Sequence, residues 1–155
     1  MKAIVFIGRV QPPTVAHKIL FDILNDSSLY RIVFIVEGVQ TSKNKQINPL
    51  TGDERKKILK PLYPNIRFEI VSSINECLDV LDILGLSPEV IVCGSDRSYS
   101  DIFKCREVMI ERNEISATLT RQHVTNNDFA TFEKTFITSS YSEFVYNLLR
   151  ERLCL

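Results

Sequence analysis

The chain has 155 residues, 45% of them hydrophobic and 25% charged, with only five glycines and six prolines. This composition excludes a disordered, collagen-like or low-complexity chain, and the length favours one globular domain over residues 1–155. Nineteen basic residues balance nineteen acidic ones. A net charge of zero argues against a dedicated nucleic-acid-binding protein, but it leaves room for a local basic pocket that binds one small phosphate ligand.

The apolar runs and the cysteines give further expectations about the class of protein. The longest uninterrupted apolar runs, Ala3–Ile7 and Ile32–Val36, are far shorter than the roughly 18 residues that cross a bilayer. We therefore expect no membrane partner and a cytoplasmic location. The four cysteines show no C-x-x-C spacing and only two histidines are present, so no zinc site is predicted and the cysteines are expected to be thiols.

Short apolar segments alternate with helical patterns along the chain. Five segments have strand character: Ala3–Ile7, Ile32–Val36, Arg67–Val71, Val90–Cys93 and Val108–Ile110. Continuous Val- and Ile-rich runs are typical of strands buried on both faces of a parallel sheet. The alternation predicts an α/β fold, a doubly wound, Rossmann-like parallel five-stranded sheet with helices on both faces.

Helix start and stop signals lie between these runs. Thr14 follows two prolines and precedes an apolar face formed by Ile19, Leu20, Ile23 and Leu24. The pattern S/T-x-x-E predicts capping boxes at Thr51, Ser73 and Ser140, and Gly85 is expected to end the second of these helices. The last helix carries Phe144, Val145, Leu148 and Leu149, in a helical C-terminal part at about 116–155.

The loops after the first and second strands are the candidate ligand-binding segments. Ligands of open α/β sheets lie outside the carboxyl ends of the strands, and the polar stretch Gln40–Asn48 follows the second strand. It is either a loop over a ligand or a solvated surface loop. The segment Gly8–His17 ends the first strand and begins a helix. A helix N-terminus favours an anion, and Thr14 and His17, three residues apart, can reach the same phosphate.

Four segments in chain order resemble those of the nucleotidyltransferase superfamily, the adenylyl- and cytidylyltransferases with a T/H-x-G-H motif. They are Gly8–His17, Asn48–Arg55 (N-P-x-T-x-x-E-R), Gly94–Arg97 (G-S-D) and Ile115–Arg121 (I-S-S-T-x-I-R). The first is similar to the signature of archaeal-type and phage-type nicotinamide mononucleotide adenylyltransferases. The resemblance implies transfer of a nucleoside monophosphate from ATP or CTP to a small phosphorylated acceptor, with Mg²⁺ as cofactor and release of pyrophosphate. It also leaves a homo-oligomer open.

The resemblance implies a role for each motif residue. Thr14, His17 and Arg121 are the expected catalytic residues, which stabilise charge on the triphosphate. The residues expected to bind the nucleotide or acceptor are Gly8, Arg9, Gln11, Ala16, Gly94, Asp96, Arg97, Ser116 and Thr118. Lys43 and Lys45 are weaker candidates for closing over the triphosphate, and Arg55 is either structural or acceptor-facing.

The chain departs from the family pattern mainly at Ala16, where glycine is usual. If this residue has a negative φ, the extra methyl group is nearly harmless. ATP with nicotinamide mononucleotide is the favoured substrate pair. The alternatives are a cytidylyltransferase acting on a sugar or polyol phosphate and a nucleotide-binding sensor without turnover. A flavodoxin-like or dinucleotide-binding domain is disfavoured because the first loop lacks G-x-G-x-x-G.

Overall fold

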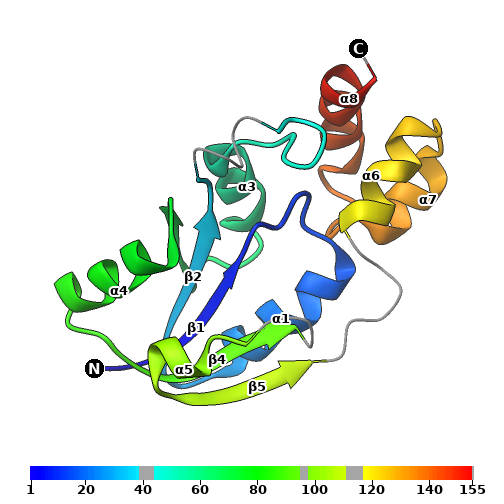
Figure 1. Ribbon diagram of the computed structural model, residues 1–155. Coiled ribbons are helices and arrows are strands. Elements are labelled where there is room, and N and C mark those ends of the chain that lie inside the picture. Colours follow the sequence, from blue (N-terminus) through cyan, green and yellow to red (C-terminus); the bar gives the residue numbers. More distant parts are fainter. Residues whose placement is uncertain (39–43, 95–97, 111–116, 155) are drawn as a thin grey trace.

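The computed structural model describes residues 1–38, 44–94, 98–110 and 117–154, and its centre is a parallel five-stranded sheet (Figure 1). The strand order is β3-β2-β1-β4-β5, and every pairing is parallel. The strands are β1 (Lys2–Gly8), β2 (Tyr30–Val36), β3 (Arg67–Val71), β4 (Ser87–Gly94) and β5 (Arg106–Ile110). All five predicted strands are confirmed, and β4 begins three residues before the predicted run.

Helices cover both faces of the sheet. They are α1 (Val15–Asp26), α3 (Gly52–Leu59), α4 (Ile74–Ile83), α5 (Ser100–Phe103), α6 (Ala117–Thr125), α7 (Phe129–Thr135) and α8 (Ser142–Leu153). One core joins the sheet to α1, α3 and α6–α8, and the other joins it to α4 and α5. Figure 1 shows α6, α7 and α8 gathered at the end of the molecule toward which β1 points. The doubly wound architecture is thus confirmed.

Alternation of side chains along the strands explains the continuous apolar runs. In β2, Ile32 and Phe34 belong to the core on the α4 side, whereas Val33 and Ile35 belong to the core on the α1 side. All four side chains are 0% exposed. A strand that contributes to two cores has no polar face, so its sequence cannot alternate between apolar and polar residues.

The predicted helix ends at Thr51, Ser73 and Gly85 are confirmed. The Thr51 hydroxyl accepts from the Glu54 backbone N–H, and the Glu54 carboxylate accepts from the Thr51 N–H. Ser73 caps α4 by accepting from the Glu76 N–H, but the predicted capping box is not complete, because the Glu76 carboxylate accepts from the backbone N–H and the hydroxyl of Ser72. Gly85 has φ 66° and its N–H donates to the Asp82 carbonyl, which is the left-handed helix end that glycine adopts without strain.

The predicted capping box at Ser140 is wrong. Helix α8 begins at Ser142 and its N-cap, Tyr141, makes no side-chain cap. The buried Ser142 hydroxyl lies 2.9 Å from the Ser139 carbonyl oxygen and 3.2 Å from a Glu133 carboxylate oxygen. Tertiary contact with α7 therefore sets the start of this helix and overrides the local motif.

Two residues of the predicted apolar helix faces lie at the surface. Ile19 of α1 is 45% exposed and Phe144 of α8 is 70% exposed. Leu20 of α1 and Leu149 of α8 are buried, so the buried face of each helix is narrower than the sequence pattern predicts. Part of the Gln40–Asn48 loop, residues 40–43, lies outside the described residues.

The expectation that the cysteines are thiols agrees with the structure, in which Cys77, Cys93, Cys105 and Cys154 are free. Burial, which raises the pKa of the Cys77 thiol to about 12, makes this residue a poor nucleophile. Within the described residues, none of the helices combines the length and the apolar character needed to span a bilayer.

An ion pair ties the C-terminal helix to the sheet half of the molecule. Both terminal nitrogens of Arg152 in α8 donate to the Glu54 carboxylate in α3, over 2.5 and 2.8 Å, and one also donates to the Pro49 carbonyl. Burial raises the pKa of Glu54, but hydrogen bonds from Arg152 and Thr51 outweigh it and the net shift is downward. The paired, ionised form is therefore the stable one in the folded state.

We expect Glu54→Gln to lower the free energy of unfolding at pH 7 by about 1 kcal/mol. Because the folded-state pKa is lowered, the Glu54 contribution is complete above the unfolded pKa, near 4.5, and is lost as the pH falls through the folded value. Urea unfolding between pH 7 and pH 3 measures this difference. Glu143→Gln, on an exposed position of α8, is the control, and an equal effect of both variants at pH 7 would contradict the prediction.

Candidate functional site

The strand order fixes where a ligand can enter. From β1 the chain winds outward to β2 and β3, and after β3 it crosses to β4 and winds the other way to β5. The loops after β1 and β4 therefore separate at the carboxyl edge of the sheet, the usual ligand position in open α/β folds. Gly8 ends β1 and Gly94 ends β4, so both lie at this point. Asp96 and Arg97, which follow Gly94, lie outside the described residues.

A buried arginine holds this edge together. Arg55 of α3 is 1% exposed, and its guanidinium donates to the carbonyls of Arg9, Val36 and Thr51. It also pairs with the Glu37 carboxylate at 3.1 Å, which in turn accepts from the Gly52 backbone N–H. Burial lowers the pKa of Arg55 and the charge of Glu37 opposes this shift. Arg55 therefore acts structurally, which was one of the two predicted roles.

The side chain of Gln11 joins the loop after β1 to the segment before α3. It is 3% exposed, its Nε2 donates to the Leu50 carbonyl at 2.6 Å, and its Oε1 accepts from the Leu50 N–H at 3.0 Å. These two bonds use the amide as a backbone-like pairing partner. Gln11 was predicted to contact a ligand; the structure directs its side chain to Leu50.

Thr14 and His17 lie together at the start of α1. Thr14 is fully buried, and its backbone N–H donates to Nδ1 of His17 at 3.0 Å. Because a backbone N–H can only donate, Nδ1 must be the unprotonated nitrogen and Nε2 carries the proton. The ring of Phe21 stacks one turn further on, at 6.3 Å between centroids. The imidazole is thereby held with a defined N–H donor.

The side chain of Arg121 connects the C-terminal motif to the loop after β1. Its Nη1 donates to the Gln11 carbonyl at 2.6 Å, across 110 positions of sequence, and its Nη2 donates to the Thr118 hydroxyl at 3.3 Å. Burial and then the nearby charge of Arg9 lower the pKa of Arg121. Arg9 is exposed and its guanidinium lies 3.5 Å from the Asn48 side-chain oxygen. Among the described residues no carboxylate pairs with Arg9 or Arg121.

The turn between these groups has an unusual backbone. Val10 has φ 46° although it is β-branched, a conformation that costs about 1–3 kcal/mol unless surrounding structure compensates. The carbonyls on either side of it, those of Arg9 and Gln11, accept from Arg55 and Arg121. The two arginines thus fix the turn from both sides.

The remaining motif residues have simpler environments. A Cβ at Gly8 would lie 2.8 Å from the Phe6 ring, so glycine is needed there for packing. Ala16 lies in the first turn of α1, where a right-handed backbone accepts alanine. Thr118 is exposed in the first turn of α6. Ser116 and Lys43 lie outside the described residues.

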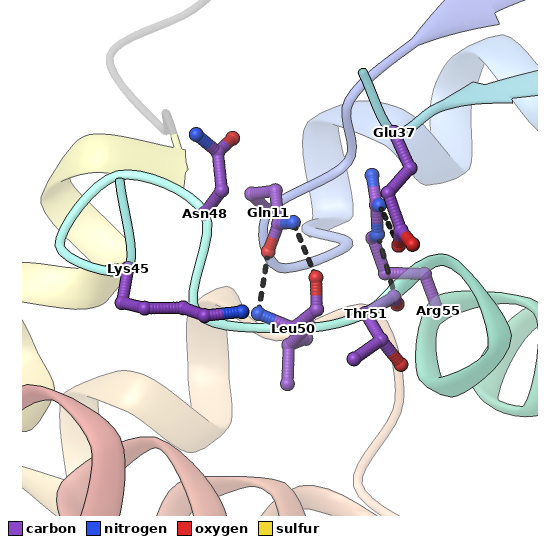
Figure 2. Close-up of a pocket in the computed structure, with 7 residues that line it drawn as sticks. All are labelled: Gln11, Glu37, Lys45, Asn48, Leu50, Thr51 and Arg55. Atoms are coloured by element: carbon purple, nitrogen blue, oxygen red, sulfur yellow. Dashed lines mark hydrogen bonds and ion pairs between the residues drawn. The ribbon is translucent and has the colours of Figure 1, made fainter. Parts of the chain in front are cut away.

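A small polar cavity lies beside Gln11 (Figure 2). It has a volume of about 30 Å³, enough for one or two water molecules rather than for a nucleotide. Its lining residues are Gln11, Glu37, Lys45, Asn48, Leu50, Thr51 and Arg55. In Figure 2 the Lys45 side chain extends toward Leu50 and Gln11, so its ammonium group lies at this cavity.

The described residues include no group of three His, Cys, Asp or Glu side chains that could hold a metal ion. A Mg²⁺ ion usually keeps several waters and binds substrate phosphates through one or two protein carboxylates at most. The described residues therefore provide no protein cage for such an ion, and a Mg²⁺ ion at this edge would have to be held mainly by oxygens of its ligand.

The sequence pattern does not mark Gln11, Glu54 and Arg152 as structural links. It predicts a ligand contact for Gln11 and a helix cap for Glu54. Glu54 does cap α3, and its carboxylate also pairs with Arg152. Nothing in the local pattern around Arg152 marks it, because its partners lie 98 and 103 positions away. Only the three-dimensional contacts reveal these residues.

Similar solved structures share this architecture from end to end. A protein described as a nicotinate-nucleotide adenylyltransferase from Vibrio parahaemolyticus superposes with a TM-score of 0.66 at 18% identity, covering 98% of this chain and 97% of its own. The nicotinic acid mononucleotide adenylyltransferase of Plasmodium falciparum, complexed with NaAD, gives 0.60 at 13% identity, covering 97% and 98%. This chain has the fold of these adenylyltransferases.

A third structure carries a nucleotide and a metal ion. The bifunctional NMN adenylyltransferase/ADP ribose pyrophosphatase of Francisella tularensis, complexed with AMP and a Mn ion, gives a TM-score of 0.70 at 16% identity. The alignment covers 99% of this chain and 52% of that one, so this chain spans about half of its length. No protein-family model matches the sequence, and no curated protein matches it either.

We expect Gln11→Glu to lower the free energy of unfolding at pH 7 by about 3 kcal/mol, because an ionised carboxylate would face the Leu50 carbonyl without a proton to donate. At a pH low enough to protonate the new carboxyl group, much of the loss should be regained. Denaturant unfolding at both pH values tests this. Gln122→Glu, at an exposed position of α6, is the control, and a Gln11→Glu protein as stable as the wild type at pH 7 would refute the paired geometry.

Proposed function

We propose that this protein is an adenylyltransferase that transfers AMP from ATP to nicotinamide mononucleotide, forming NAD and pyrophosphate. One observation carries the proposal: the bond from Arg121 to the Gln11 carbonyl. It joins the two sequence segments that resemble the phosphate-binding motifs of the nucleotidyltransferases, at the carboxyl edge of β1. The adenylyltransferase neighbours, with their bound AMP and NaAD, support the same substrate class.

The proposed reaction is an in-line displacement at phosphorus. A phosphate oxygen of the acceptor attacks the α-phosphorus of ATP, a new P–O bond forms, and the bond to the bridging oxygen breaks so that pyrophosphate leaves with the electron pair. Such a transfer depends chiefly on positioning and on stabilisation of negative charge, and it needs no covalent intermediate on the protein.

His17 has the geometry for charge stabilisation. Its Nδ1 accepts from the Thr14 N–H, which keeps the proton on Nε2 as a donor for a phosphate oxygen. Thr14 is fully buried, so in this proposal its main task is to orient the imidazole. Hydrogen-bond donors that are held in place before the reaction stabilise developing charge most effectively.

Arg121, Arg9 and Thr118 supply the remaining groups. The two guanidiniums are near enough for the charge of Arg9 to lower the pKa of Arg121, and a polyphosphate between them would relieve that repulsion. Thr118 lies in the first turn of the nine-residue helix α6, where backbone N–H groups and the helix dipole favour phosphate oxygens. When bound, Mg²⁺ would neutralise charge on the triphosphate, held there by the phosphate oxygens themselves.

Other predicted residues keep their proposed roles. Asp96, Arg97 and Ser116 remain candidates for contacts to the nucleotide or acceptor, and Gly8, Ala16 and Gly94 for close approach of the backbone to the ligand. Because Ala16 lies in a regular helical turn, it gives little support to a sensor that has lost turnover. A cytoplasmic location and one domain over residues 1–155 accompany the proposal.

The activity is tested by measuring pyrophosphate release with Mg²⁺, using ATP or CTP and a set of phosphorylated acceptors. The proposal expects release with ATP and nicotinamide mononucleotide. Release only with nicotinic acid mononucleotide would change the acceptor and keep the enzyme class. Release only with CTP and a sugar or polyol phosphate would replace the proposal with a cytidylyltransferase, and binding of ATP without turnover would replace it with a sensor.

We expect His17→Ala to lower kcat by about 10²–10³-fold, the usual effect of removing one charge-stabilising donor, with only a small change in thermal stability because the ring is partly exposed. His123→Ala, which removes the other histidine of the chain, is the matched control and should keep wild-type kcat. Full activity of His17→Ala would show that this imidazole does not act on the phosphates.

A further inference from the structure

A second, larger hollow lies at the opposite end of the sheet from the candidate site. It has a volume of about 690 Å³ and is lined by the segments around the amino ends of β1, β2 and β3 and by the last turns of α3. Figure 1 shows this end near the N-terminus, away from α6–α8. Small-molecule sites commonly have volumes of about 300–1,000 Å³, so this groove is large enough for a ligand, unlike the cavity beside Gln11.

The charged groups of the groove are mostly positive. Four cationic side chains line it, those of Arg31, Lys56, Lys60 and Arg67, against one carboxylate, that of Glu69. Glu69 lies 2.6 Å from Nε of Arg67 and neutralises that one charge. No carboxylate of the described residues pairs with the other three cations, Arg31, Lys56 and Lys60, in a chain whose total net charge is zero.

Backbone carbonyls hold two of the cations in place. Lys60 Nζ donates to the carbonyls of Pro64 and Ile66, at 3.1 and 2.8 Å. Arg31 Nε donates to the Ser27 carbonyl at 2.8 Å, and within the described part of the chain its terminal nitrogens make no further hydrogen bond. Carbonyl oxygens carry no net charge, so these bonds fix the cations without neutralising them. A ligand would find these groups already ordered, which reduces the entropic cost of binding.

We propose that this groove binds the oligophosphate group of a small molecule, as a site separate from the candidate catalytic edge. Phosphate oxygens match both the guanidinium of Arg31 and the ammonium groups of Lys56 and Lys60. Tyr30, a half-buried residue, also lines the groove, and an aromatic residue there suits a ligand with an apolar or aromatic group attached to its phosphates. A nucleic acid would require a longer basic track, whereas these charges are confined to one groove of small-molecule size.

The structure supplies a closely matched pair of variants to test this site. Lys56 and Lys57 are neighbours in α3, and Lys56 lines the groove whereas Lys57 is exposed outside it. Replacing either with alanine removes the same charge from the same helix. Inorganic tripolyphosphate is the probe, titrated calorimetrically into the wild type, Lys56→Ala, Lys57→Ala and Arg121→Ala proteins, with the thermal unfolding of each variant recorded.

We expect Lys56→Ala to weaken tripolyphosphate binding at the groove by about fivefold, as loss of one charge-assisted contact, and Lys57→Ala to change it less than twofold. A second replacement, Arg31→Gln, should weaken it further. Binding at the groove should persist in Arg121→Ala, which affects the opposite end.

Three results would overturn the proposal: absence of binding to the wild type, an equal effect of Lys56→Ala and Lys57→Ala, or binding that is lost in Arg121→Ala and unaffected by Lys56→Ala. The last would place the ligand only at the candidate catalytic edge. Since the groove shares no residue with that edge, failure of the groove proposal would leave the proposed transferase activity untouched.

Discussion

The buried guanidinium of Arg55 is the interaction on which the ligand-binding edge depends. Moving a charged group out of water is costly, and the cost is met here because carbonyls and one carboxylate surround it. Its partners come from the segments that end β1, end β2 and begin α3. The strained backbone at Val10 is tolerated next to it. Without this group the carbonyls of Arg9 and Val36 would lose a donor, and the bonds between Gln11 and Leu50 would be left to join the two loops.

The C-terminal part of the chain is also attached to the ligand-binding edge. The Ile137 backbone N–H donates to the Pro13 carbonyl, Thr14 forms an isolated bridge with Phe136, and Arg152 reaches the Pro49 carbonyl. These bonds place α6–α8 against the first loop and the segment before α3. The phosphate-binding groups proposed for the two halves of the chain are therefore positioned by one continuous network of backbone contacts.

The sequence was informative wherever local physics decides the structure. Short segments with strand character, three of them continuous apolar runs, identified all five strands. Capping patterns located the starts of α3 and α4. Both kinds of signal depend on near neighbours in the sequence. The local pattern failed at Ser140, because the contact between Ser142 and Glu133 sets the start of α8 instead. It also failed at Phe144, because α8 buries a narrower face than predicted. The long-range partners of Arg55, Gln11 and Arg121 lie 18 to 110 positions away, so no spacing rule could identify those contacts. The roles of Asp96, Arg97 and Ser116 remain predictions.

The contact between Arg121 and Gln11 also has a consequence for biosynthesis. Translation proceeds at roughly 5–20 residues per second, and domains tend to form as their segments emerge. The five strands of the described part of the chain lie before residue 111, so the sheet can begin to assemble before α6–α8 have left the ribosome. A nascent chain at that stage has β1 and its loop but lacks the guanidinium that completes it. Any phosphate-binding capacity that needs both groups would consequently arise only after α6 has emerged from the ribosome.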